Sequence, residues 1–249
     1  MNVVNLRVAN FIKLKAEGYR PNRDIIIALT ADEEGGPVNG VQHLLAEHRE
    51  LVDAEFVINE GGGGGLFDGK PLINSVQAAE KVYQSYTLEV TNRGGHSSLP
   101  RKDNAIYELM HALHNIQAHE FPIILNEVTR AYFRQTASTL PAAQGDMIER
   151  MLADQNDAEA VAALARETSF NSRMRTTCVA TQLQAGHAEN ALPQRAQATV
   201  NCRILPGTDP DEIKATLAQV IGNPAVSISP IKPANLSPPS PLTEEVMAP

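Results

Sequence analysis

The architecture of this chain follows from nine residues, Val82-Tyr83-Gln84-Ser85-Tyr86-Thr87-Leu88-Glu89-Val90. Within them, the large apolar side chains Val82, Tyr86, Leu88 and Val90 all lie an even number of positions apart. Because successive side chains of a strand point to opposite faces, this pattern predicts a strand with one face on a core and the other toward solvent.

The elements expected downstream of this strand complete a recognisable plan. They are a strand at 82–92, helices at 103–118 and 145–168, strands at 174–184 and 195–204, a helix at 209–222 and a strand at 225–231. Without the residues at about 120–170, the order is β-α-β-β-α-β, which is the plan of a ferredoxin-like sandwich. The sequence therefore predicts a ferredoxin-like α+β domain over 80–232 with a helical insertion at about 120–170.

The residues before position 80 predict a different kind of sheet. An amphipathic helix is expected over 3–18, and a second helix over 40–50. Short continuous apolar runs at 24–30 and 54–58 flank that second helix, and such runs are typical of strands buried on both faces of a parallel sheet. This β-α-β unit predicts that residues 1–79 form part of an α/β domain, whose ligands bind at the carboxyl ends of its strands.

The last residues predict a linker. Five of the twelve residues at 230–241 are prolines, which exclude regular helix and central strand. We therefore expect residues 233–249 to be a linker and the start of a return to the first domain.

Composition excludes several classes of protein. The net charge is -8 and the basic residues are scattered among acidic ones, unlike the concentrated basic surface of a nucleic-acid binder. The longest apolar runs, such as 25–31, are far short of the roughly 18 to 20 residues that cross a bilayer, so a soluble chain is expected. The two cysteines, Cys178 and Cys202, lie in predicted strands and are interpreted as buried thiols rather than as a disulfide.

Carboxylates follow both apolar runs of the first domain. The first run leads into Asp32-Glu33-Glu34 and the second into Glu60, which precedes five glycines. Carboxylates at neighbouring parallel strand ends converge at one sheet edge, where they suit a bound divalent cation. The alternative interpretation is an exposed acidic turn and a flexible glycine linker, and the pairing of the two strand ends favours the metal site.

Three residues of the second domain are candidates for substrate contact. His96 lies in a Gly-Gly-His-Ser-Ser-Leu-Pro loop, and Asn190 and Arg203 are donors suited to a carboxylate or a developing oxyanion. The alternatives are an exposed loop histidine, an asparagine that holds a turn and an arginine at a strand end. Taken singly, these three residues favour the structural alternatives.

Read together, in order and at these spacings, the motifs resemble the zinc-dependent aminoacylase, carboxypeptidase S and dipeptidase family, which includes relatives of succinyl-diaminopimelate desuccinylase. The run at 15–36, which ends in Thr-Ala-Asp-Glu-Glu-Gly-Gly, carries the closest resemblance. The resemblance implies a parallel-sheet zinc-hydrolase catalytic domain and a ferredoxin-like lid, through which many members form homodimers.

The resemblance also implies roles for the candidate residues. Glu33 matches the family's general base, while Glu34 and Glu60 match carboxylate ligands of two zinc ions, with cobalt or manganese as alternatives. His96, Asn190 and Arg203 match residues that bind the substrate carboxylate and polarise the scissile carbonyl, the histidine typically in the partner subunit's site. The implied reaction is metal-dependent hydrolysis of an amide or peptide bond in a dipeptide, a carboxyl-terminal residue or an N-acyl amino acid.

The family's other metal ligands, a His-x-Asp motif with its bridging Asp and a late His, have no match in these 249 residues. We therefore expect a fragment truncated at both ends and inactive by itself. The alternative is a genuine short protein that acts as a non-catalytic dimerisation module. The compartment, cytoplasmic or periplasmic, stays open.

Overall fold

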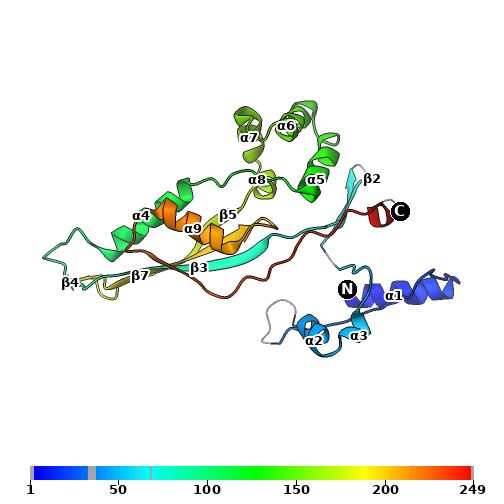
Figure 1. Ribbon diagram of the computed structural model, residues 1–249, viewed down its shortest axis with the longest axis horizontal. Helices are drawn as coiled ribbons and strands as arrows, with labels where there is room; N and C mark the ends of the chain where they lie inside the picture. Colours follow the sequence, from blue (N-terminus) through cyan, green and yellow to red (C-terminus); the bar gives the residue numbers. More distant parts are fainter. Residues whose placement is uncertain (1–2, 33–37, 60, 68, 248–249) are drawn as a thin grey trace. The chain divides into compact units, whose positions relative to one another are not determined.

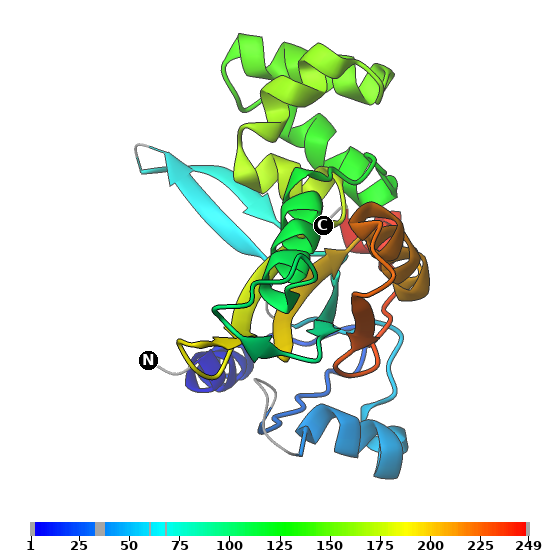
Figure 2. The same cartoon turned by 90° about the vertical axis from the view of Figure 1, so that its left-hand side faces the viewer.

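The computed structural model describes residues 3–32, 38–59, 61–67 and 69–247. They form two units, Met1–Glu60 and Gly61–Pro249. The predicted mixture of helix and sheet is confirmed. Figure 1 shows the elements along the chain, and Figure 2 shows them from the side.

A four-stranded antiparallel sheet organises the second unit, with the order β5-β7-β3-β8. Two helices, α4 and α9, pack on one face of this sheet (Figure 1). The strand order and the two helices confirm the predicted β-α-β-β-α-β plan. The bounds are β3 (Val82–Thr91), α4 (Ala105–Ala118), β5 (Thr177–Ala185), β7 (Arg195–Ile204), α9 (Pro210–Ile221) and β8 (Ser227–Pro230).

The alternation read from residues 82–90 produces the two faces of this sheet. Tyr86, Leu88 and Val200 are almost fully buried beneath the helices. Across the sheet from them, the other face carries polar side chains, and the Thr199 hydroxyl there donates to the Gln182 side chain over 3.1 Å. Burial of one face supplies the packing energy, while the polar face stays free for other contacts.

A helical insertion separates α4 from β5 and has its own core. Its helices are α5 (Glu127–Ala137), α6 (Ala142–Ala153), α7 (Ala158–Ala165) and α8 (Thr168–Met174). The sequence predicted one helix over 145–168, but Asp157 ends that continuity because its side chain caps the start of α7. The insertion buries Phe133, Ile148 and Met151 in a cluster separate from the core beneath α4 and α9.

The first unit contains the predicted helices but not the predicted strands. The helices are α1 (Val3–Ala16), α2 (Gly40–Glu47) and α3 (Arg49–Val52). Residues 24–30 and 54–58 form no strand, so those two expectations were wrong. Ile25 to Leu29 are exposed instead, because a buried strand needs hydrogen-bonded neighbours and the described part of this unit supplies none.

A hairpin that the sequence did not predict lies among the residues assigned to the first predicted domain and belongs to the second unit of the structure. Its strands are β1 (Gly63–Phe67) and β2 (Lys70–Ser75). The proline-rich tail lies along the second unit, where the Ile231 N–H donates to the Ser85 carbonyl over 2.9 Å. A short helix, α10 (Glu244–Met247), follows the tail.

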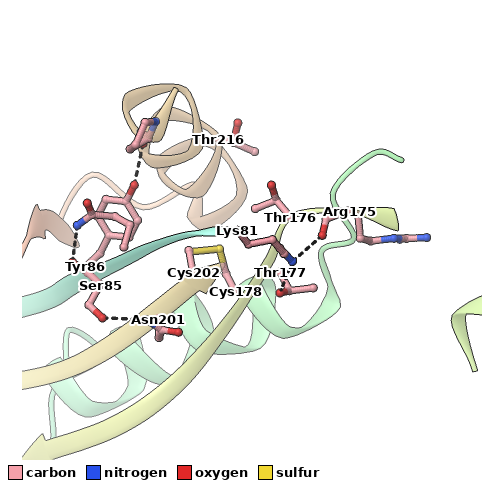
Figure 3. The surroundings of a disulfide bond; sticks show 12 residues. Lys81, Ser85, Tyr86, Arg175, Thr176, Thr177, Cys178, Asn201, Cys202 and Thr216 are labelled. Carbon is pink, nitrogen blue, oxygen red and sulfur yellow. Dashed lines mark hydrogen bonds between the residues drawn. A yellow bond between two sulfur atoms is a disulfide. The ribbon is translucent and has the colours of Figure 1, made fainter. Parts of the chain in front are cut away.

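Cys178 and Cys202 form a disulfide, which corrects the interpretation as free thiols. They are direct cross-strand partners of β5 and β7, with Cα atoms 4.1 Å apart (Figure 3). The sequence places them 24 positions apart, and only the pairing of those two strands brings them together. The bond ties the edge strand β5 to the interior of the sheet.

Candidate functional site

Three predicted site residues, Glu33, Glu34 and Glu60, lie outside the described residues. Asp32, which directly precedes Glu33, has a left-handed φ of 59°, a conformation that Asp tolerates better than most residues. Gly40, at the start of α2, packs against the same turn, and a Cβ there would lie 2.9 Å from the Ala31 carbonyl oxygen. The start of α2 therefore fixes the backbone that leads into the acidic segment.

His96 and Asn190 lie next to each other, although 94 residues separate them. His96 belongs to β4 (Gly95–His96), which pairs with β6 (Ala191–Leu192) in a short antiparallel ribbon. The Ser97 N–H donates to the Asn190 carbonyl over 2.9 Å and ties the two loops together. Both candidate side chains are exposed, so the ribbon that brings their backbones together presents an imidazole and an amide to solvent.

The His96 ring is held from one side. The Ser98 N–H donates to Nδ1 of His96 over 3.2 Å, and the Ser98 hydroxyl lies 2.8 Å from the same nitrogen. Sequence reasoning did not single out Ser98. The available signal was a hydroxyl residue two positions after a loop histidine, a spacing at which a side chain can contact the backbone of a turn.

Arg203 lies at the opposite end of β7 from this ribbon. Arg195, the first residue of β7, pairs with Thr91 at the ribbon end of the sheet, and eight residues at roughly 3.3 Å each place Arg203 about 26 Å farther along the strand. Its guanidinium carbon lies 4.7 Å from the centre of the Tyr83 ring. Within one copy of the chain, the structure therefore joins His96 with Asn190 and separates both from Arg203.

Lys81 lies at the Arg203 end of the sheet and joins it to the insertion. Its ammonium donates to the carbonyls of Ser172 (2.9 Å) and Arg175 (2.8 Å) and to the Thr177 hydroxyl (3.1 Å), as Figure 3 shows for the last two. Burial, with a further contribution from the Arg203 charge, lowers the pKa of Lys81 to about 8. The three oxygens oppose this change, but removing most of the water around the charge outweighs them.

This lysine predicts a pH-dependent stability. Between pH of about 8 and 10.5 the unfolded chain holds the Lys81 proton more tightly than the folded one, so folding becomes more favourable as pH rises through that range. We expect wild type to gain free energy of unfolding relative to Lys81→Met between about pH 7 and about pH 9.5. Urea unfolding of both proteins measures this, and a constant difference between them contradicts the low pKa.

An apolar groove lies between α4 and β5. Its volume is about 790 Å³, and its lining includes Ile106, Met110 and Leu113 from α4 and Ala180 and Leu183 from β5. Leu183 exposes 64% of its surface. The sequence patterns did not identify this surface, because apolar residues of a predicted helix and strand are ordinarily core.

A bulge in β5 builds this groove. The pairing with β7 shifts between Ala180 and Gln182, so Thr181 is an extra residue. After the shift, Leu183 opposes Ala198, a residue buried beneath the helices. Without the extra residue, strict alternation would turn Gln182 toward the helix layer in place of Leu183. The bulge thus extends the apolar surface to the end of the edge strand.

The described residues contain neither a metal-binding cluster nor a membrane-spanning helix. No group of three or more His, Cys, Asp and Glu side chains in the described ranges suits a metal ion. Among the same residues, no helix combines the length and apolar character that crossing a bilayer requires.

The family match covers most of the second unit. Residues 78–228 match a family model, M20_dimer, described as the peptidase dimerisation domain. The chain is 30% identical over 237 residues to "Probable carboxypeptidase S-like 2" of Dictyostelium discoideum, covering 92% of this chain and 44% of that protein. It is 29% identical to the human "N-fatty-acyl-amino acid synthase/hydrolase PM20D1", covering 88% and 45%.

The chain is also similar to a yeast carboxypeptidase and to a solved archaeal structure. Carboxypeptidase S of Saccharomyces cerevisiae is 25% identical, with 80% of this chain and 37% of the yeast protein covered. A solved M20 family metallo-carboxypeptidase from Sulfolobus solfataricus aligns at 17% identity with a TM-score of 0.37, covering 63% of this chain and 45% of that one. The chain spans less than half the length of the curated relatives named here.

Proposed function

Since this chain belongs to the M20 peptidase family, we propose that it takes part in the metal-dependent hydrolysis of an amide or peptide bond. The substrate is a small molecule with a carboxylate, such as a dipeptide, a peptide carboxyl terminus or an N-acyl amino acid. Residues 80–232 form the lid and dimerisation domain of this hydrolase, and residues 1–79 form part of its catalytic domain.

The observation that carries this proposal is the β4–β6 ribbon with His96 and Asn190. The ribbon carries an imidazole and an amide, and both groups can donate to a carbonyl oxygen, which becomes more negative as an amide is attacked. Glu33 takes the proton of the attacking water and passes it to the leaving amine. Arg203 binds the substrate carboxylate through its guanidinium.

Two carboxylates do not complete the metal site. Zinc takes four ligands in structural sites and three protein ligands plus water in catalytic sites. Glu34 and Glu60 alone do not fit a zinc ion, and the described residues add no cluster that could complete the set. In this proposal the chain of 249 residues is therefore inactive by itself.

In a homodimer, residues from opposite ends of two lid domains can act on one substrate. The ribbon with His96 and Asn190 follows the Arg195 end of β7, which lies about 26 Å along the strand from Arg203, so in this arrangement one copy does not place all three residues on one small substrate. A second copy solves this if the ribbon of each chain reaches the site of its partner. The partner of this chain is then another copy of itself, in addition to its small-molecule substrate.

The groove between α4 and β5 supports that second copy. β5 is the edge strand of its sheet, and its sequence Thr-Cys-Val-Ala-Thr-Gln-Leu-Gln-Ala carries no charged residue. Natural edge strands are usually protected by charges or proline, and an uncharged apolar edge is suited to pairing. Two copies related by a twofold axis pair β5 with β5 and bury both grooves, without bringing like charges together on these strands.

The variants that test the catalytic assignment are Glu33→Gln and Glu34→Gln, made in the protein extended by its flanking sequence to the length of its relatives. Glu33→Gln should lower hydrolysis of a panel of N-acyl amino acids and dipeptides at least a hundredfold while zinc content is unchanged, because a general base is lost. Glu34→Gln should lower zinc content.

Glu47→Gln is the matched control, because it removes the charge of an exposed glutamate in α2 of the same unit. It should keep both activity and zinc. Full activity in Glu33→Gln contradicts the assignment of Glu33 as the base. Unchanged zinc content in Glu34→Gln contradicts the assignment of Glu34 as a ligand.

A further inference from the structure

Ser98 contacts the ring of His96, whose chemistry depends on which ring nitrogen carries the proton. The neutral imidazole of His96 carries a single N–H, either on Nδ1 or on Nε2, and only the nitrogen with the N–H can donate to a substrate. This question deepens the proposed function and rests on it for the role of His96.

The contacts to Nδ1 decide between the two forms. The Ser98 backbone N–H is always a donor, and it lies 3.2 Å from Nδ1. A proton on Nδ1 would therefore face another N–H, so Nδ1 must accept with its lone pair. The Ser98 hydroxyl, 2.8 Å from the same nitrogen, is then also placed to donate to it.

The turn that holds this arrangement is itself fixed at several points. The Leu99 N–H donates to the His96 carbonyl over 3.0 Å and closes a turn with Ser97 and Ser98 at its centre. The Ser97 N–H is held by the Asn190 carbonyl over 2.9 Å. Ser98 therefore cannot move away from Nδ1 without disturbing the loop that carries Asn190.

We propose that Ser98 is a positioning residue that fixes His96 as the tautomer with its proton on Nε2, so that the ring acts as a hydrogen-bond donor to the substrate. Within the described residues, Nε2 has no hydrogen-bond partner in the protein, and the ring is exposed. Its proton is therefore available to a ligand. His96 stabilises charge on the substrate oxygen in this arrangement by donating from Nε2.

The first test is nuclear magnetic resonance on the 249-residue chain labelled with ¹⁵N. Long-range nitrogen–proton spectra identify which imidazole nitrogen carries the proton, and the missing signal in His96→Gln assigns His96 among the seven histidines. We expect Nε2 to carry it, with a coupling across the hydrogen bond between the Ser98 amide nitrogen and Nδ1. A proton on Nδ1, or the absence of that coupling, overturns the inference.

The second test is kinetic, in the extended protein. Ser98→Ala should lower kcat roughly fivefold with little change in KM, since one hydrogen bond to the ring is lost, and Ser98→Thr should restore the rate. Ser97→Ala is the matched control, because within the described residues Ser97 makes a hydrogen bond only through its backbone, and it should have wild-type kinetics. Equal kcat values for Ser98→Ala and Ser97→Ala contradict a positioning role for the Ser98 hydroxyl.

The two tests separate this inference from the proposed function. If the wild-type extended protein hydrolyses no amide substrate, the proposed function fails. The resonance experiment still gives its own answer, because the tautomer of His96 is read directly from the chain without any turnover.

Discussion

The variant Leu183→Asp should be a monomer at concentrations where the wild-type chain is a dimer. Leu183 lies on the edge strand β5, lines the groove against α4, and exposes 64% of its surface in a single copy. In the proposed dimer this surface is buried. A twofold interface contains the changed residue twice, so two unpaired carboxylates would have to leave water at once.

The expected effect is large because burying a charge without a partner costs several kcal/mol for each ion. Two such charges should raise the dimer dissociation constant at least a thousandfold. Sedimentation velocity across a range of protein concentrations measures the change. Circular dichroism checks that Leu183→Asp keeps the fold, which we expect because the side chain is exposed in the monomer.

Leu236→Asp is the matched control for this experiment. Leu236 lies in the proline-rich tail, is 68% exposed and does not line the groove. The same substitution at nearly the same exposure should leave the dimer intact. If Leu183→Asp stays dimeric, or if both variants dissociate equally, the groove between α4 and β5 is not the dimer interface.

Mixing two inactive variants of the extended protein should restore activity. Glu33→Gln lacks the proposed base, and His96→Ala lacks the proposed donor. If His96 serves the partner's site, a mixed dimer contains one site with both residues intact and one site with neither. Random exchange of subunits makes half of the dimers mixed, so about a quarter of wild-type activity should return.

The opposite geometry predicts no recovery. If His96 served the site of its own chain, each site of a mixed dimer would lack one residue, and the mixture would be as inactive as its parents. Steady-state hydrolysis before and after subunit exchange distinguishes the two cases. The mixture with added Leu183→Asp in both chains is the control, because subunits that cannot pair should show no recovery.

Local patterns predicted the elements of the second unit well, for a physical reason. The alternation at residues 82–90 and 195–204 reflects burial of one face, and each of these segments forms one long strand in the structure. Asn104 and Asp209 directly precede helices α4 and α9, and their side chains cap the first turn of each. These signals are carried by residues close together in the chain.

The missed features depend on residues far apart in the chain. The disulfide needed the pairing of β5 with β7, and the groove needed a bulge at Thr181. The apolar runs at 24–30 and 54–58 have the composition of buried strands, yet such a strand exists only when neighbours pair with it.

For the candidate site, too, the sequence indicated the residues but not their arrangement in space. The motifs selected His96, Asn190 and Arg203 from the sequence, but their spacing along the chain gave no indication of their spacing in the fold. Arg203 is only 13 positions after Asn190 and lies far from it along β7, whereas His96 is 94 positions before Asn190 and is its neighbour. The roles of Glu33, Glu34 and Glu60 stay predictions.

The most direct measurement of the whole account compares the 249-residue chain with the extended protein for zinc content and amide hydrolysis. The substrates are a small panel of N-acyl amino acids and dipeptides. The account predicts about two zinc ions per chain and hydrolysis in the extended protein, and a dimer without hydrolysis in the 249-residue chain. Hydrolysis by the 249-residue chain contradicts the ligand assignment, and hydrolysis by neither favours a non-catalytic dimerisation module.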